Sequence, residues 1–322
     1  MVPHNRMMKA FGQLLQLGIL SVGLFSLLGY FGKFNRFFEL TNHFRLQYFI
    51  GALIGMVVTL LLRKWRWALV AFGCLFLNAL HIFPWFSFSG SPIKLGGQRI
   101  KLVQANVRYN NDQYDRVIAY LKQESPDIAV LQEVTETWAQ HLAPLNELFQ
   151  SARIEPQGHG TGIALYSKFR FSKAETLNLC ADCRLSLYAQ INLGTTPVNV
   201  MTIHPPTPIG ARDFADRNRQ FEAVATYLNS LATPKILIGD FNDTVWSSYH
   251  AQLLQQSQLV NVRKGSGLLP SWPSWLIFKP LMIPIDQCLV SPEIKVAAVK
   301  TGENIGSDHL PLVVELVIPS QK

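Results

Sequence analysis

Six short polar segments stand at or near the ends of apolar, strand-like runs between residues 100 and 310. Their carboxylate, amide and imidazole groups are the side chains that ligate hard metal ions, bind phosphate oxygens and transfer protons. A single Gly-Asp-x-Asn or Ser-Asp-His segment indicates only a turn, because Asp and Asn hydrogen-bond to nearby backbone. Six such segments in order indicate one site. They are Gln104-Ala105-Asn106-Val107, Leu131-Gln132-Glu133-Val134, Thr202-Ile203-His204, Gly239-Asp240-Phe241-Asn242, Ile285-Asp286-Gln287 and Ser307-Asp308-His309.

The apolar runs beside these segments predict strands, which would bring the polar residues to one edge of a sheet. Ile100–Val107 and Asp127–Glu133 are rich in β-branched residues and Leu, as buried strands are. Between them, Asp112–Glu124 has apolar residues at helical spacing, and a second helix is expected over Thr135–Phe149. This strand–helix–strand order is typical of layered α/β folds.

The rest of the chain adds more strands and one more helix, Phe214–Leu231. The further strands are expected at Gly162–Ser167, Leu185–Leu193, Val198–His204, Ile236–Gly239, Ile283–Val290 and Leu312–Ile318. The pattern fits an α/β fold in which two mixed sheets pack together with helices outside.

As an ordered series, these segments resemble the endonuclease/exonuclease/phosphatase superfamily, the deoxyribonuclease I-like metal-dependent phosphoesterases. The resemblance covers Ile100–Ile318. The matching segments are QANV, LQEV, GTGIALYSK, TIHPP, LIGDFND, PIDQCLVS and GSDHLPLVVEL. The resemblance implies a four-layer sandwich of two packed mixed sheets flanked by helices. It also implies hydrolysis of a phosphate ester by metal-assisted attack of water.

By the same resemblance, Glu133 is the first expected metal ligand, with Asn106 beside it and Asp308 assisting the metal or its waters. Carboxylate, amide and water oxygens suit Mg²⁺ or Mn²⁺. The sequence departs from the family at Arg108, where some family nucleases have an acid. A second carboxylate ligand is therefore not expected at that position.

The resemblance also implies the roles of five catalytic residues. Asp240 would orient or deprotonate the attacking water, and Asn242 would donate to a phosphate oxygen. His309 would contact the phosphate while paired with Asp286, a pairing that favours the charged imidazolium. His204 would be a second phosphate contact or the acid that protonates the leaving group.

Three apolar segments precede this region, at residues 11–31, 46–62 and 67–88. Each approaches or reaches the roughly 20 residues that a bilayer-spanning helix needs, and none contains an acid, Lys or Arg. We therefore expect a membrane domain of three transmembrane helices at residues 1–90 and a catalytic domain at residues 91–322. A cleaved signal peptide fits poorly because two further apolar segments follow the first.

The apolar segments, with basic residues beside them, predict an integral protein of the plasma or inner membrane. Residues 1–90 hold eight of the 29 Lys and Arg residues but one of the 21 acids, so residues 91–322 are nearly neutral, at +1. With the N-terminus in the cytoplasm, the inner flanks hold five basic residues and the outer loop three. This difference predicts an extracytoplasmic catalytic domain. Arg212, Arg217 and Arg219 are candidates for a local basic patch.

Cys180 and Cys183 form a Cys-Ala-Asp-Cys segment. A complete zinc site is not expected, because no second pair of Cys or His residues stands nearby at zinc spacing. Two interpretations stay open, a small disulfide in an oxidising compartment and two free thiols.

The leading functional hypothesis is a membrane-anchored, divalent-metal-dependent phosphoesterase whose substrate is a phosphate ester such as a lipid headgroup. Its partners would be that substrate and the lipid bilayer. An extracytoplasmic nuclease acting on DNA or RNA is the second hypothesis, and a catalytically inactive adaptor is the third. The complete set of site residues argues against the adaptor. The sequence indicates no oligomeric state.

Overall fold

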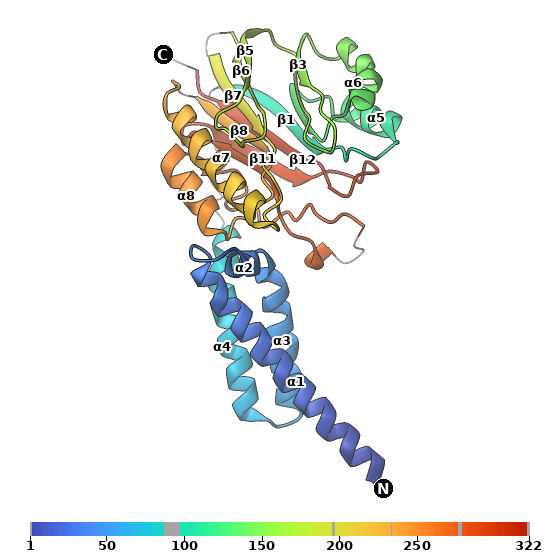
Figure 1. Ribbon diagram of the computed structural model, residues 1–322, viewed down its shortest axis with the longest axis vertical. Coiled ribbons are helices and arrows are strands. Elements are labelled where there is room, and N and C mark those ends of the chain that lie inside the picture. Colours follow the sequence, from blue (N-terminus) through green and yellow to red (C-terminus); the bar gives the residue numbers. More distant parts are fainter. Residues whose placement is uncertain (1, 87–96, 195–196, 233, 276–278, 321–322) are drawn as a thin grey trace. The chain divides into compact units, whose positions relative to one another are not determined.

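The computed structural model describes residues 2–86, 97–194, 197–232, 234–275 and 279–320. The chain divides into two compact units (Figure 1). The first consists of Met1–Ser87 with Trp246–Ser248, and the second of Phe88–Val245 with Tyr249–Lys322. The domain boundary expected between residues 90 and 91 lies outside the described residues.

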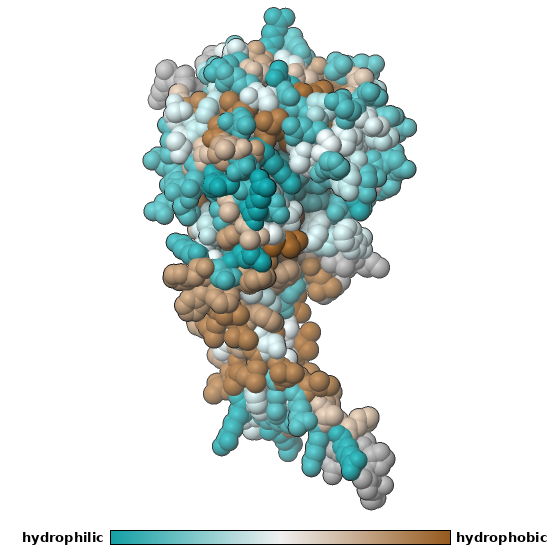
Figure 2. All heavy atoms as spheres, viewed as in Figure 1, coloured by the Kyte–Doolittle hydropathy of each residue, from teal (hydrophilic) through white to brown (hydrophobic). Residues whose placement is uncertain are grey.

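The first unit is helical. Among the described residues, three stretches are long and apolar enough to cross a membrane, Arg6–Phe31, Arg36–Leu61 and Trp65–Trp85. Figure 2 shows hydrophobic side chains along the outer surface of these helices. The three segments expected from the sequence overlap these stretches. The elements are α1 (Val2–Leu28), η1 (Gly29–Phe31), α2 (Arg36–Thr41), η2 (Asn42–Phe44), α3 (Arg45–Leu61), α4 (Trp65–Ile82) and η3 (Phe83–Trp85).

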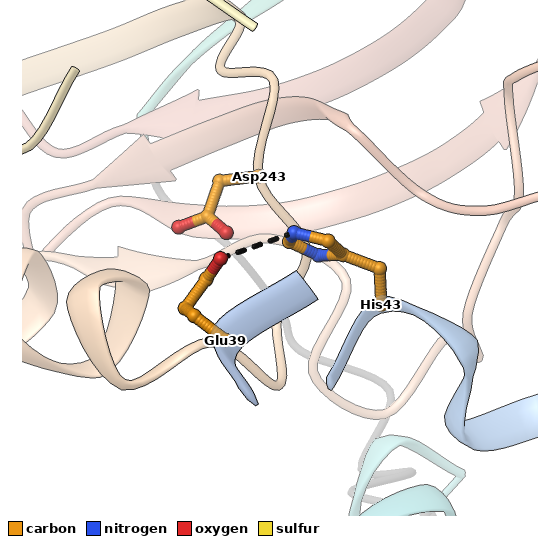
Figure 3. Close-up of side chains that lie close together, drawn as sticks. All are labelled: Glu39, His43 and Asp243. Carbon is orange, nitrogen blue, oxygen red and sulfur yellow. Dashed lines mark ion pairs between the residues drawn. The ribbon is translucent and has the colours of Figure 1, made fainter. Parts of the chain in front are cut away.

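Several polar side chains inside this helical unit form hydrogen bonds or ion pairs with each other, because apolar surroundings offer no water to bind them. Arg45 donates to the side-chain oxygen of Asn42 (2.6 Å) and to the backbone oxygen of Ser26 (2.8 Å). At the end of α2, Glu39 forms an ion pair with His43, at 3.4 Å (Figure 3). These contacts fix the connection between the first and second apolar stretches.

In the described part of the second unit, twelve strands form two six-stranded sheets. The first has the order β11-β12-β1-β2-β4-β3 and the second β5-β6-β7-β8-β10-β9. In each sheet one central pair is parallel, β1 with β2 and β7 with β8, and the other pairs are antiparallel. The predicted pair of mixed sheets is therefore confirmed.

The strands of the first sheet are β1 (Gln98–Asn106), β2 (Ile128–Gln132), β3 (Ser151–Glu155), β4 (Ile163–Ser167), β11 (Lys295–Thr301) and β12 (Leu312–Ile318). Those of the second are β5 (Phe171–Leu177), β6 (Ser186–Asn192), β7 (Pro197–Ile203), β8 (Lys235–Asp240), β9 (Val260–Asn261) and β10 (Asp286–Val290).

The main core lies between the two sheets. Because strand side chains alternate between faces, Leu102 and Val130 of the first sheet join Val200 and Ile238 of the second in one buried cluster. The residues next to them in sequence point the other way, toward helices. Two faces of each sheet are thus buried, which explains why the central strands are almost continuously apolar.

Helices cover both outer faces, completing the four layers (Figure 1). On the first sheet, Leu121 and Trp138 pack with Val103 and Leu131. On the second, helix residues such as Phe221 pack with strand residues in a separate cluster. The helices are α5 (Tyr114–Glu124), α6 (Glu136–His141), α7 (Ala211–Asn229) and α8 (Ser248–Ser257), with the short η4 (Ala143–Glu147) and η5 (Lys279–Leu281).

Two sequence expectations about elements were wrong. The helix expected over Thr135–Phe149 ends at His141 and continues as η4, because Pro144 cannot donate a helical hydrogen bond. The sequence analysis also did not place α8, the two-residue β9, or the three longer strands β3, β5 and β11. The three strands are half-exposed, so they lack the strong apolar runs by which the central strands were found.

A buried histidine on α8 makes the stability of this unit sensitive to acid. His250 is fully buried, and its Nε2 lies 3.2 Å from Asn261 Nδ2. Burial, with the charges of Arg263 and Arg217, lowers the pKa of His250 to about 3. The unfolded chain binds a proton at this histidine below pH 6.5, whereas the folded chain does not, so stability falls as the pH drops from 6.5 toward 3.

We therefore predict that His250→Gln weakens this acid sensitivity. Between pH 7.5 and pH 5, wild type should lose about 2 kcal/mol of unfolding free energy that the variant keeps, given a folded pKa of about 3. Urea unfolding in detergent, followed by tryptophan fluorescence, measures the difference. Other groups titrate alike in both proteins, so an equal loss in both would contradict the assignment.

Candidate functional site

The strand topology brings the expected site residues to one edge of both sheets. Asn106 ends β1, and Glu133 follows β2, which runs parallel to β1. In the other sheet Asp240 ends β8, and His204 follows β7, its parallel neighbour. Asp286 begins the antiparallel strand β10 and lies opposite Asp240. Residues that are far apart in the sequence therefore lie close together, because their strands end or begin at the same edge of the sheets.

A histidine between two carboxylates forms the centre of the site. His309 Nδ1 lies 2.9 Å from Asp286 Oδ2, and His309 Nε2 lies 3.7 Å from Asp240 Oδ2. All three residues are buried. Ser307 holds the loop, donating from its hydroxyl to Asn106 O (2.7 Å) and accepting from His309 N (3.1 Å). The expected Asp286–His309 pair is present in the structure.

The charges in this group shift one another's ionisation. Burial alone would disfavour the charged ring, but Asp286 and Asp240 raise the pKa of His309 to about 10. Burial would also raise the pKa of Asp286, yet His309 and donors from Ser271 and Gln104 outweigh it, and that pKa is lowered. For Asp240 the effect of burial is larger than the opposing effect of the His309 charge, and the pKa of Asp240 is raised to about 7. His309 is therefore a cation and Asp286 an anion, and Asp240 is the group of the three that can accept a proton near neutral pH.

Asn106 links the central group to Glu133. Its amide nitrogen donates to Glu133 Oε1 (2.8 Å) and to Asp240 Oδ2 (3.0 Å), and its side-chain oxygen accepts from Arg108 N (2.9 Å). Glu133 Oε2 accepts from Tyr109 N, at 2.9 Å. The half-buried Glu133 carboxylate is therefore held by one donor on each oxygen.

The backbone at the site is unusual. Glu133, Asn242 and Arg108 have φ angles of 64°, 49° and 60°, a left-handed conformation that side-chain-bearing residues rarely adopt. Just before Asp240, a Cβ at Gly239 would lie 2.1 Å from Ile203 O. Only glycine allows the two parallel strands to approach each other there.

Asn242 and His204 flank Asp240. Asn242 N donates to Asp240 Oδ1 (2.9 Å), and its side chain contacts Pro205 O (3.0 Å) and the hydroxyl of Thr207 (3.2 Å). His204 Nε2 lies 3.5 Å from Asp240 Oδ2. Burial, with the charges of Arg184 and His309, lowers the pKa of His204 well below its usual value. The ring is therefore neutral near pH 7.

Asp308 makes different contacts from those of the other site residues. Its Oδ1 lies 3.8 Å from Arg108 Nε, and its Oδ2 accepts from Trp272 Nε1 at 3.2 Å. Asp308 still contributes to the site electrostatically, since its charge helps to raise the pKa of the adjacent His309.

Two amides that sequence analysis left without a role connect the sheets behind the site. Gln104 Nε2 donates to Asp286 Oδ1 (2.7 Å) and to Gln132 Oε1 (2.8 Å), and Gln132 Nε2 donates to Thr202 Oγ1 (3.1 Å). All four residues are buried. The only available signal was a Gln inside each of two apolar strands, in the segments QANV and LQEV.

Of the three candidates for a local basic patch, Arg212, Arg217 and Arg219, Arg217 does not lie at the surface. Arg217 is fully buried, 3.2 Å from Asp243 Oδ1, and donates to Asn242 O at 3.5 Å. It therefore supports the turn that carries Asn242. Arg212 and Arg219 each pair with Asp216 on α7 and with Asp182 in the loop between β5 and β6. A helical pattern alone does not reveal which arginines face acids.

Arg184 is a further residue that the sequence analysis missed. It lies just before β6, and its NH1 is 3.5 Å from His204 O. Burial lowers the pKa of Arg184, while the charges of Asp240, Glu133 and Asp213 raise it. A cation therefore stands beside the carboxylates of the site. Nothing in the motif series marked this position.

At the site, a cluster of three side chains and a separate carboxylate offer ligand atoms for a divalent metal. The ligand atoms of Asp240, Asp286 and His309 lie within 4.8 Å of one another, but a charged imidazolium has no lone pair for a metal. The Glu133 carboxylate fits better, because it is a half-buried oxygen ligand beside the Asn106 amide, 2.8 Å away. Hard oxygen donors of this kind suit the small divalent ions.

Solved structures with this fold have low sequence identity to the chain. The D. rerio TDP2 complexed with single-strand DNA product has 14% identity and a TM-score of 0.59, covering 69% of this chain and 100% of that one. A functionally unknown conserved protein from Enterococcus faecalis V583 has 18% identity and a TM-score of 0.58, covering 68% and 99%. The comparison with curated proteins gives no match.

An endonuclease/exonuclease/phosphatase from Bacteroides vulgatus is similar as well, with 18% identity, a TM-score of 0.57 and coverage of 69% of this chain and 99% of that one. The model of the Endonuclease/Exonuclease/phosphatase family matches residues 103–309, from β1 to the histidine at the centre of the site. The protein therefore belongs to the endonuclease/exonuclease/phosphatase family and is a metal-dependent hydrolase of phosphoric ester bonds.

Proposed function

We propose that the protein is a membrane-anchored phosphoesterase that hydrolyses a phosphate ester of a lipid headgroup, with Mg²⁺ or Mn²⁺ as its cofactor. The observation that carries the proposal is the combination in one chain of this hydrolytic site with three stretches able to cross a membrane. Attachment to the bilayer raises the local concentration of a lipid substrate.

Glu133 would hold the metal, with Asn106 and Asp308 oriented toward the same ion or its waters. When bound, the metal supplies positive charge that offsets the charge developing on the phosphoryl oxygens. Asn106 keeps Glu133 and Asp240 together through its two N–H contacts. The left-handed backbone at Glu133 is stored strain of the kind found at functional sites.

Asp240 orients the attacking water and accepts its proton. A pKa of about 7 is close to neutral pH, where a general base is most effective. The cationic ring of His309 faces the same carboxylate and donates to a phosphate oxygen, with Asp286 holding it in place. Asn242 supplies a further donor. His204, neutral near pH 7, serves as a hydrogen-bonding contact rather than as the acid.

Exposed apolar side chains on the site loops support a substrate at a membrane surface. Tyr109, Ile209 and Trp275 are 49%, 69% and 59% exposed. Tyr109 donates its backbone N–H to Glu133, Ile209 lies in the loop after His204, and Trp275 is in the loop whose Trp272 donates to Asp308. Aromatic and aliphatic groups of this kind are typical of surfaces that meet lipid headgroups.

A nuclease is the second candidate, because the D. rerio TDP2 structure named above was solved with a single-strand DNA product. The charge distribution favours the lipid substrate. Residues 91–322 carry about one net positive charge, and Arg212 and Arg219 are paired with acids. A duplex-binding surface ordinarily neutralises several phosphates with free cations.

The metal assignment predicts that Glu133→Gln reduces turnover by a factor of about 10² or more at saturating Mg²⁺, because an anionic ligand is replaced by a neutral one of equal size. Glu136→Gln, an exposed position three residues later, is the matched control and should retain wild-type turnover. Thermal unfolding checks that both variants are folded. Wild-type turnover in Glu133→Gln would refute the ligand assignment.

The substrate assignment predicts preferential hydrolysis of phospholipid embedded in the same nanodisc as the full-length protein. The panel adds single-stranded DNA, duplex DNA and soluble inositol phosphates, each with Mg²⁺, with Mn²⁺ and with EDTA. EDTA should abolish all turnover. Robust DNA cleavage that falls steeply with salt, without lipid hydrolysis, would establish the nuclease instead.

The basic residues flanking the apolar stretches predict that the C-terminus lies outside the cytoplasm. In bacterial cells, a periplasmic phosphatase reporter fused after Lys322 should be active, and a cytoplasmic reporter at the same position should be inactive. The reverse pattern would place the catalytic site on the cytoplasmic side.

A further inference from the structure

The loop between β5 and β6 carries a disulfide next to the hydrolytic site. Cys180 and Cys183 are joined, with their Cα atoms 5.1 Å apart, and Cys183 N donates to Cys180 O at 3.0 Å. Of the two interpretations left open by the sequence, the structure has the disulfide. The bond closes a tight turn immediately before Arg184, so it limits the positions available to that residue.

A second set of contacts holds the same loop against α7. Asp182, between the two cysteines, pairs with Arg212 (3.3 Å) and Arg219 (3.1 Å). After the disulfide, the backbone oxygen of Arg184 accepts from Gln220 Nε2, also at 3.0 Å. The loop is therefore attached on both sides of the disulfide, and Arg184 leaves it in a defined direction.

The Arg184 guanidinium has little to bind within the protein. Among the described residues, its side-chain hydrogen bond is a long one, 3.5 Å to His204 O. Among the described residues, no carboxylate oxygen lies within 4.0 Å of its nitrogens, although Asp240 and Glu133 act on its charge from farther away. A half-buried arginine usually has an acidic partner, because a guanidinium offers five donors.

Among the described residues, the other cations near the site each lie beside a carboxylate or an amide oxygen. Both nitrogens of His309 face carboxylates, Arg108 faces Asp308, and the buried Arg217 faces Asp243. Arg263 is buried and donates to Gln287 Oε1, at 2.8 Å. Arg184 differs from them in having no carboxylate or side-chain amide acceptor in reach among the described residues, so its donors can join His309 in binding an anionic substrate.

We propose that Arg184 binds a phosphate oxygen of the substrate and that the Cys180–Cys183 disulfide loop holds it in position to do so. The inference rests on the phosphoesterase site of the proposed function but not on a lipid substrate. Guanidinium and phosphate form paired, charge-assisted hydrogen bonds, which lysine cannot reproduce because its ammonium lacks the planar arrangement of donors.

The test uses the full-length protein in detergent, with bis(4-nitrophenyl) phosphate as substrate and inorganic phosphate as competing ligand. Arg184→Gln should raise both KM and the inhibition constant for phosphate about tenfold or more, as expected for a lost hydrogen bond between charged groups. Arg184→Lys should recover part of the loss. Arg99→Gln, an exposed arginine at the opposite end of β1, should change neither constant.

The role of the disulfide is tested by the double variant Cys180→Ser/Cys183→Ser and by wild type treated with dithiothreitol. Dithiothreitol reduces the S–S bond to two thiols and is oxidised to its cyclic disulfide, so two electrons and two protons are transferred. Both treatments should weaken phosphate inhibition several-fold. Adding Arg184→Gln to the double variant should raise the inhibition constant for phosphate little more than Arg184→Gln does alone, because both changes remove the same interaction.

Different failures have different meanings. An unchanged inhibition constant in Arg184→Gln, with turnover that still depends on Glu133, would refute the phosphate contact while leaving the proposed function intact. Fully additive effects of the arginine and cysteine changes would refute the positioning by the disulfide. Wild-type protein that binds inorganic phosphate through Arg184 but hydrolyses no member of the panel would refute the proposed function instead.

Discussion

A protonated histidine between two buried carboxylates is the interaction on which the rest of this structure depends. Moving each of these charges out of water costs several kcal/mol, so such a group persists only when the charges offset one another and every remaining lone pair has a donor. Here His309 supplies the cation, Asp286 and Asp240 the anions, and neutral amides complete the hydrogen bonds. Loss of any one partner leaves a buried charge uncompensated.

These donors come from both sheets, and this requirement fixes how the sheets face each other. Gln104 on β1 reaches Asp286 on β10, and Gln132 on β2 reaches Thr202 on β7. Apolar contacts between sheets tolerate small shifts, whereas a buried hydrogen bond is lost within about an ångström. The amide chain therefore sets the register of a core that is otherwise made of Val, Ile and Leu.

A second layer of buried charge supports the turns that carry the site residues. Arg217 pairs with Asp243 and contacts Asn242 O, while Arg263 donates to Gln287, the residue after Asp286. Left-handed backbone is costly; at Asn242 the contact from Arg217 supports it, and at Glu133 the donors Asn106 and Tyr109 hold the side chain. The helical unit also pairs its buried polar groups internally. There, Arg45 donates hydrogen bonds to Asn42 and to the backbone of Ser26 among apolar helices.

Much of the fold and site could be predicted from the sequence because the strongest signals are local. Apolar runs located the central strands and the three long apolar helices, and the ordered polar segments named Asn106, Glu133, Asp240 and His309, which the structure places in one connected group. The half-exposed strands β3, β5 and β11 have weak patterns and were missed. Pro144 was not recognised as the end of a helix.

The sequence by itself determined the identity of the chemical groups and the order in which strands deliver them. Only the tertiary structure decided which cations are neutralised and which remain available. Arg217, expected in a surface patch, is buried against Asp243, whereas Arg184, which no motif marked, stands beside His204 without an acid in reach among the described residues. The reason is physical: burial and pairing depend on distances between residues far apart in the chain, and charge effects depend on both.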